Sequence, residues 1–238
     1  MRMLFCLCLC LCLALGIAEA SPYDPLIDRS ARRHGVDPLV LRTIAAQESR
    51  KQPWTFNADG EGFHFESKEL AVNALWALTK RPWMAKVHPA NRSKPIRLFF
   101  ASQQAAGAYV ASFNKGRRSS GKSPVSLRTD KVKEVLKGQA RVRRLWLFNT
   151  DIGIAQISYR FHGKNKASIN QWFDPAFNLN YAAKHLAELK KKYGSDITAA
   201  GYYHSKTYSV RQKYLKGFRR NYEEERNAAT SSTLASNR

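Results

Sequence analysis

The sequence predicts a mainly helical fold with a small β element. The prediction rests on three patterns. Asp-Pro pairs at 37–38 and 174–175 each supply an N-cap and a first-turn proline ahead of an apolar stripe. The stripes recur at the i, i+4 spacing of one helix face. Residues 57–65 instead combine turn residues with alternation, which is typical of a short hairpin. With 44% apolar and 11% aromatic residues, the chain of 238 residues is neither disordered nor collagen-like.

The N-terminal segment 1–20 has the features of a cleaved export signal. Arg2 precedes an apolar run that ends at Ala18, and Ala18-Glu19-Ala20 offers small residues at the two positions that signal peptidase reads. The run is short for a membrane span. We therefore expect an exported, periplasmic protein that contacts the membrane only before cleavage; an uncleaved anchor is the alternative.

All four cysteines, Cys6, Cys8, Cys10 and Cys12, lie inside this segment. The processed chain would then contain no thiol. That excludes a cysteine nucleophile, a cysteine-ligated metal site and a disulfide-stabilised fold, so the hydrophobic core must hold the fold unaided.

The expected helices follow from caps, apolar periodicity and glycine or proline stops. The first two are bounded by Gly35 and Pro53, and the third begins at the Ser67 cap. The segment 117–122 is expected to form an exposed loop, and 227–238 a disordered tail. The expected helices span residues 23–34, 38–50, 67–78, 98–113, 125–136, 175–193, 196–203 and 209–225.

Positive charge is concentrated in the middle of the chain. The formal net charge is +22, and between residues 80 and 144 there are 17 basic side chains against Asp130 and Glu134 alone. A basic exported protein is expected to meet an anionic polymer or surface, for which peptidoglycan, anionic lipid and nucleic acid are candidates. Nucleic acid is the weakest of these, because no recognition motif accompanies the charge.

Glu48 is the first residue that could carry chemistry. It continues the row of Val40 and Ile44, so a carboxyl group lies in line with an apolar stripe at a helix C-terminus. An apolar setting and the negative end of the helix dipole both favour the protonated acid, which is the form that can protonate a departing glycosidic oxygen. A solvated glutamate at a fraying helix end is the alternative.

Two further motifs offer groups that suit a sugar ligand. In Gly153-Ile154-Ala155-Gln156-Ile157, glycine permits close backbone approach and Gln156 supplies both a donor and an acceptor. Tyr202-Tyr203-His204-Ser205 offers aromatic rings and hydroxyls. The alternatives are a buried turn and a helix end packed by tyrosines.

The order of these motifs along the chain resembles that of the lysozyme-like soluble lytic transglycosylases of peptidoglycan, the SLT domain family. In that family a helix ending in Glu-Ser is followed by a Gly-Leu-Met-Gln-Ile-like motif, then by an Asp-Pro helix and finally by an Ala-Tyr-Asn-Ser-Gly motif. The resemblance covers roughly residues 23–56 and 146–222. It implies one mainly α, lysozyme-like (α+β) domain over residues 21–226, interrupted by a basic insertion at 57–145 between the Glu48 helix and the Gly153 motif.

The resemblance also implies the roles of individual residues. Glu48 matches the catalytic acid/base, and no cofactor or metal is implied. Two departures stand out: His204 replaces an asparagine, and the insertion is far longer than is usual. Such an insertion is similar to that of a subgroup serving secretion, conjugation or flagellar assembly. The residues expected to bind substrate are Ser49, Gly153, Gln156, Tyr203 and His204.

The activity implied is non-hydrolytic cleavage of the bond between N-acetylmuramic acid and N-acetylglucosamine. Glu48 would protonate the glycosidic oxygen and then act as base while the muramic acid 6-hydroxyl closes on C1, giving a 1,6-anhydro end. A muramidase would need a second carboxylate opposite Glu48. A non-catalytic wall-binding or assembly protein is the other alternative. The candidates for a second carboxylate are Asp59, Glu61, Glu66 and Asp151.

Overall fold

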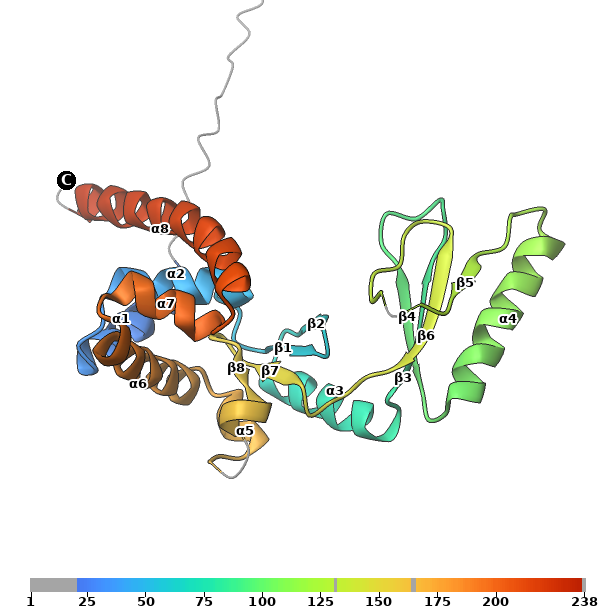
Figure 1. Ribbon diagram of the computed structural model, residues 1–238, viewed down its shortest axis with the longest axis horizontal. Helices are drawn as coiled ribbons and strands as arrows, with labels where there is room; N and C mark the ends of the chain where they lie inside the picture. The colour runs from blue at the N-terminus through green and yellow to red at the C-terminus, as the bar shows by residue number, and fades with distance from the viewer. Residues whose placement is uncertain (1–20, 131, 164–165, 237–238) are drawn as a thin grey trace, which may run out of the picture.

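The computed structural model describes residues 21–130, 132–163 and 166–236, arranged as a helical lobe, a small sheet and a second lobe (Figure 1). The expected export signal lies outside the described residues. Within the described part, no helix combines the length and apolar character needed to cross a membrane. The mainly helical, α+β architecture that the sequence predicts is confirmed.

The helical lobe is built from the two ends of the chain. The Asp37 carboxylate accepts a hydrogen bond from the Leu39 N–H, and Asp174 does the same for Phe177, as the Asp-Pro pairs predict. The core contains fully buried Leu41 and Ile44 from one end of the chain. Its helices are α1 (Asp24–Arg33), α2 (Pro38–Ser49), α5 (Ile169–Trp172), α6 (Pro175–Tyr193), α7 (Asp196–His204) and α8 (Tyr208–Ser236).

The final helix is longer than the sequence predicts. The segment 227–238 was expected to be disordered, yet α8 continues to Ser236. It packs across α2, and just beyond the end of α2 the half-buried Lys51 pairs with Glu225 of α8 at 2.7 Å. A helix anchored in this way has already met the cost of nucleation, and alanine-containing sequence can then extend it.

The small sheet joins the chain before the insertion to the chain after it. Its order is β2-β1-β7-β8, and the expected hairpin is its β1–β2 pair. β1 also pairs with β7, where Phe56 lies opposite Ile152. Both side chains are buried in the main core. The strands are β1 (Thr55–Ala58), β2 (Glu61–His64), β7 (Thr150–Ile152) and β8 (Ile157–Ser158).

The insertion folds into a lobe with its own core. After α3 (Lys68–Lys80), a sheet of order β4-β3-β6-β5 carries α4 (Gln103–Ser119) against it (Figure 1). We call residues 83–144 the inserted lobe. Its strands are β3 (Trp83–His88), β4 (Ile96–Phe100), β5 (Ser126–Arg128) and β6 (Gln139–Arg144), and its core contains Ala85, Val87, Ala106, Val110, Val125 and Ala140.

Two helix predictions in this region are wrong, the one for residues 98–113 in part and the one for residues 125–136 entirely. Residues 98–100 belong to β4, and the helix begins only at Gln103. No helix forms over 125–136 among its described residues; Val125 is buried in the second core and β5 pairs parallel with β6. Pairing with a distant strand overrides local periodicity here. Arg117 and Arg118, expected in a loop, occupy the last turn of α4.

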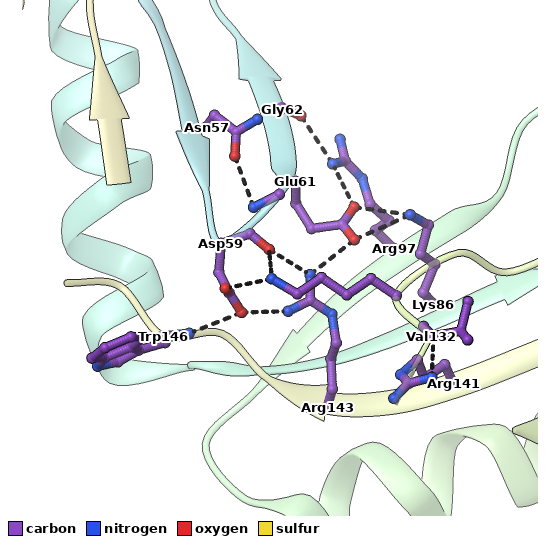
Figure 2. A network of polar contacts seen from close by, with 12 residues as sticks. Asn57, Asp59, Glu61, Gly62, Lys86, Arg97, Val132, Arg141, Arg143 and Trp146 are labelled. Carbon is purple, nitrogen blue, oxygen red and sulfur yellow. Dashed lines mark hydrogen bonds and ion pairs between the residues drawn. The ribbon is translucent and has the colours of Figure 1, made fainter. Parts of the chain in front are cut away.

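A network of ion pairs fastens the inserted lobe to the small sheet (Figure 2). We call it the interlobe clasp: Asp59 and Glu61 of the β1–β2 hairpin with Lys86, Arg97, Lys133 and Arg143 of the inserted lobe. Arg143 bridges the two acids, at 2.6 Å from Asp59 Oδ2 and 3.1 Å from Glu61 Oε1. Lys86 Nζ lies 3.0 Å from Glu61 Oε2. Burial pushes the pKa of Glu61 upward, but the contacts with Lys86 and Arg143 outweigh it and hold that pKa below its usual value.

The first prediction concerns this clasp. The Glu61 side chain is only 5% exposed, so Glu61→Gln leaves buried cations short of their counter-charge and should lower the free energy of unfolding by roughly 2 to 4 kcal/mol. Because the pKa of Glu61 is lowered in the folded state, its contribution is present above the unfolded value of 4.5 and is lost as the pH falls. Urea unfolding should therefore show a larger deficit at pH 7 than at pH 3.

The control is Glu66→Gln, which changes the same net charge at an exposed position. Equal, small losses for the two variants would contradict a structural role for the clasp.

Candidate active site

A pocket of about 290 Å³ opens where the helical lobe meets the small sheet. Residues from both ends of the chain form its wall, while none of the lining residues comes from the inserted lobe. The lobe therefore does not contribute to the wall of this pocket. The lining residues are Glu48, Asn149, Asp151, Gln156, Ile157, Ser158, Phe161, His162, His185, Tyr203 and His204.

Glu48 lies on the last turn of α2 and its carboxyl group faces this pocket. The side chain is 16% exposed, and Oε1 lies 3.4 Å from His204 Nδ1. Oε1 is buried and makes no hydrogen bond with any described residue. A buried polar atom without a partner is costly in a native fold, and the Tyr214 hydroxyl, which interacts with Glu48, is packed beside this carboxyl group. The expected protonation of Glu48 stays a prediction.

Asp151 is the second acid of the pocket. It follows Thr150 on β7, in register with Ser158 of β8. Burial raises the pKa of Asp151 to about 6, Ser158 opposes this rise, and the neighbouring Glu48 charge adds to it. Of the four acids considered as a second carboxylate, Asp151 is the one that lines the pocket. Asp59 and Glu61 are held in the clasp, and Glu66 is exposed outside the pocket.

Gln156 also lines the pocket, as the sequence predicts. Its side-chain N–H donates to the Gly153 carbonyl at 2.9 Å, which orients the amide group. The amide oxygen has no hydrogen-bond partner among the described residues and can accept from a ligand. The backbone φ of Gln156 is 46°, a conformation that is uncommon for a residue with a side chain and recurs at functional sites.

The structure places Gly153 and Ser49 behind the pocket wall, not among its lining residues. A Cβ atom at Gly153, where φ is 82°, would lie 2.5 Å from Asn178 Nδ2. The close approach that requires glycine is therefore made by Asn178 and not by a ligand. The buried Ser49 hydroxyl donates to the Ile154 carbonyl at 2.6 Å. Both residues support the site from behind its wall, and their expected contact with substrate stays a prediction.

Tyr203 and His204 complete the wall opposite the small sheet. The Tyr203 hydroxyl donates to the Ala155 carbonyl at 2.7 Å, and burial raises the pKa of this tyrosine well above its usual value. The His204 ring stacks on Tyr214, with centroids 4.2 Å apart. This stacking holds the imidazole beside Glu48, where the resembled family has an asparagine. The three sequence-predicted residues Gln156, Tyr203 and His204 thus lie together with Glu48 in one pocket.

Two other pocket residues were missed at the level of the sequence. His162 and His185 were not among the candidate site residues, yet both line the pocket, with ring centroids 4.6 Å apart. Burial, together with the positive charges of His185 and Lys166, lowers the pKa of His162 to about 4. Their positions lie outside the recognised motifs, so spacing could not reveal them. Among the described residues, no group of three or more His, Cys, Asp or Glu side chains could hold a metal ion.

Comparison with known proteins found one family. The family model described as "Transglycosylase SLT domain" matches residues 131–228. This segment carries Asp151, Gln156, Tyr203 and His204 but not Glu48, which the fold adds from α2. Searches of curated proteins and of solved structures found no significant match.

The second prediction concerns the buried charge of Asp151. Its pKa is raised from 3.8 to about 6 in the fold, so its stabilising contribution is present below 3.8 and is lost as the pH rises through 6. A shift of about two units corresponds to roughly 3 kcal/mol. Asp151→Asn should therefore raise the melting temperature at pH 7.5 and change it little at pH 4. A stabilisation that does not depend on pH would show that the charge is not its cause.

Proposed function

From the match of residues 131–228 to the transglycosylase SLT domain, which supports a lytic transglycosylase family for this chain, we propose that the protein cleaves peptidoglycan glycan strands without hydrolysis. The bond is that between N-acetylmuramic acid and N-acetylglucosamine, and the product carries a 1,6-anhydro end. The observation that carries this proposal is the Glu48 carboxyl group, which lines the same pocket as Gln156 and Tyr203.

In this mechanism Glu48 first donates its proton to the glycosidic oxygen as that oxygen leaves. It then accepts the proton of the muramic acid 6-hydroxyl while this group bonds to C1. The proton is returned and the substrate supplies its own nucleophile. His204 Nδ1, at 3.4 Å from Glu48 Oε1, is placed to orient the carboxyl group between the two steps. Gln156 offers its amide oxygen to a donor on the sugar.

Asp151 favours a second candidate, a muramidase that hydrolyses the same bond. A hydrolytic mechanism needs a carboxylate across the bond from the acid, and Asp151 is a pocket acid whose pKa differs from that of an exposed aspartate. The two candidates differ in their dependence on this residue. Asp151→Asn should leave most of the turnover of a lytic enzyme, while a muramidase that uses Asp151 would lose roughly 100-fold or more.

We further propose that the protein is exported to the periplasm and opens the wall locally for a secretion, conjugation or flagellar apparatus. Three features support this: the apolar segment 1–20, the absence of cysteine beyond it and the insertion of residues 57–145. No residue of the inserted lobe lines the pocket, so its charged surface can bind a partner or the cell wall without involving the pocket.

The third prediction concerns the acid. Glu48→Gln keeps the shape of the side chain but removes the transferable proton, so turnover of purified sacculi should fall roughly 100-fold or more. The matched control is Glu66→Gln, which makes the same substitution outside the pocket. Retained turnover in a folded Glu48→Gln protein would refute the assignment.

The fourth prediction concerns attachment to the wall. Arg117 and Arg118 end α4, and Lys122 follows in the exposed turn. Replacing all three with glutamine should weaken retention on sacculi at low salt more than it slows cleavage of short soluble fragments, which need only the pocket. Normal, salt-independent retention by the triple variant would show that this surface is not the anchor.

A further inference from the structure

Beside the pocket lies a surface with large exposed aromatic rings. Trp146 is 55% exposed and Phe161 is 70% exposed, whereas most aromatic side chains of the helical lobe are buried or half-buried. We call Trp146, Arg160 and Phe161 the aromatic rim. Phe161 also lines the pocket, so the rim continues its wall outward.

Arg160 is the charged centre of this rim. Its guanidinium carbon lies 5.0 Å from the Trp146 ring centroid and 5.2 Å from that of Phe161. Contact with the two rings holds the planar group, while its N–H donors point along its edges. Within the described residues Arg160 forms no ion pair and no hydrogen bond through its side chain. A guanidinium that is held in place but lacks a counter-ion suits bidentate recognition of a carboxylate.

The backbone fixes the rim relative to the pocket. The Trp146 N–H donates to Asp59 Oδ2 at 3.4 Å, and its carbonyl accepts from the N–H of Asn149, a pocket residue, at 2.9 Å. Figure 2 shows the Trp146 ring pointing away from the interlobe clasp. Arg160 and Phe161 belong to the π-helical turn Tyr159–Gly163, which also carries His162 into the pocket wall. Such turns are frequent at functional sites.

Two acids, Glu48 and Asp151, line the pocket. The positive charges of Lys166 and Lys206, which are outside the lining, lower the pKa of His162. Arg160 adds a third cation in the same π-helical turn as His162. Glu188 opposes these cations: its negative charge raises the pKa of His162, and it lies 3.7 Å from His185 Nδ1. An anionic group of a bound ligand is therefore favoured beside Arg160 and disfavoured beside Glu48 and Asp151.

Resting on the proposed function, we propose that Arg160 of the aromatic rim binds a carboxylate carried by the side chain of the muramic acid that occupies the pocket. The glycan backbone is uncharged, so this carboxylate comes either from the lactyl group of a bare strand or from the peptide stem attached to it. Arg160 is then a specificity residue that distinguishes muramic acid from N-acetylglucosamine at the pocket edge.

The test measures dissociation constants in a Glu48→Gln background, in which the glycan is not consumed. Three tetrasaccharide probes separate the sources of the carboxylate: peptide-bearing muropeptide, the same glycan stripped of peptide, and chitotetraose, which has no carboxylate. Arg160→Gln should weaken binding of at least one carboxylate-bearing probe roughly 5- to 10-fold and leave chitotetraose unchanged. Arg160→Lys should recover only part of the loss, because lysine keeps the charge without the planar fork.

Arg219→Gln is the matched control, since Arg219 is exposed on α8 and is not a pocket residue. It should leave the affinity for all three probes unchanged. A loss confined to the peptide-bearing probe assigns the carboxylate to the stem, and a loss confined to the bare strand assigns it to the lactyl group. Equal losses for all probes, or no loss for any, would overturn the proposal while leaving the proposed function intact. Failure of the Glu48→Gln parent to bind any of the glycans would overturn both.

Discussion

The pocket depends on one junction between segments that are 105 residues apart. The buried Ser49 hydroxyl donates to the Ile154 carbonyl at 2.6 Å, tying the end of α2 to the loop between β7 and β8. The fully buried Asn178 secures the other side of that loop: its amide donates to the Ile152 carbonyl and accepts from the Ala155 N–H, both at 2.9 Å. Because the Ser49 and Asn178 side chains are both hydrogen-bonded to this loop, the junction fixes Glu48 against Gln156 in the loop and Asp151 on the adjoining β7.

The same junction explains how a long insertion is tolerated. The chain leaves the small sheet after β2 and returns to it at β7, so the inserted lobe can fold around its own core without entering the pocket. The interlobe clasp attaches the inserted lobe to the small sheet. Asp59 links the clasp to the aromatic rim. Its Oδ2 atom pairs with Arg143 of the clasp and also accepts a hydrogen bond from the backbone N–H of Trp146 in the rim.

The sequence predicted those features of the fold and the site that depend on residues close together in the chain. The Asp-Pro caps, the hairpin and the Glu48, Gln156 and Tyr203 motifs lie where they were expected, because each depends on neighbouring residues or on a short motif. The inserted sheet was missed, since β5 and β6 pair over a distance that periodicity does not report. Ser49 and Gly153 lie behind the pocket wall, a difference that their motifs do not reveal, because motif membership does not separate residues that line a pocket from those that support its wall. His162 and His185 converge only through the fold.

The most direct test of the central claim is the mass of the muropeptides that the purified protein releases from sacculi. If Glu48 transfers the proton and the muramic acid 6-hydroxyl closes on C1, the products carry 1,6-anhydro ends and are each one water lighter than hydrolysis products. Their release should depend on Glu48. Products with reducing ends would contradict the lytic mechanism and assign the second carboxylate, Asp151, to hydrolysis.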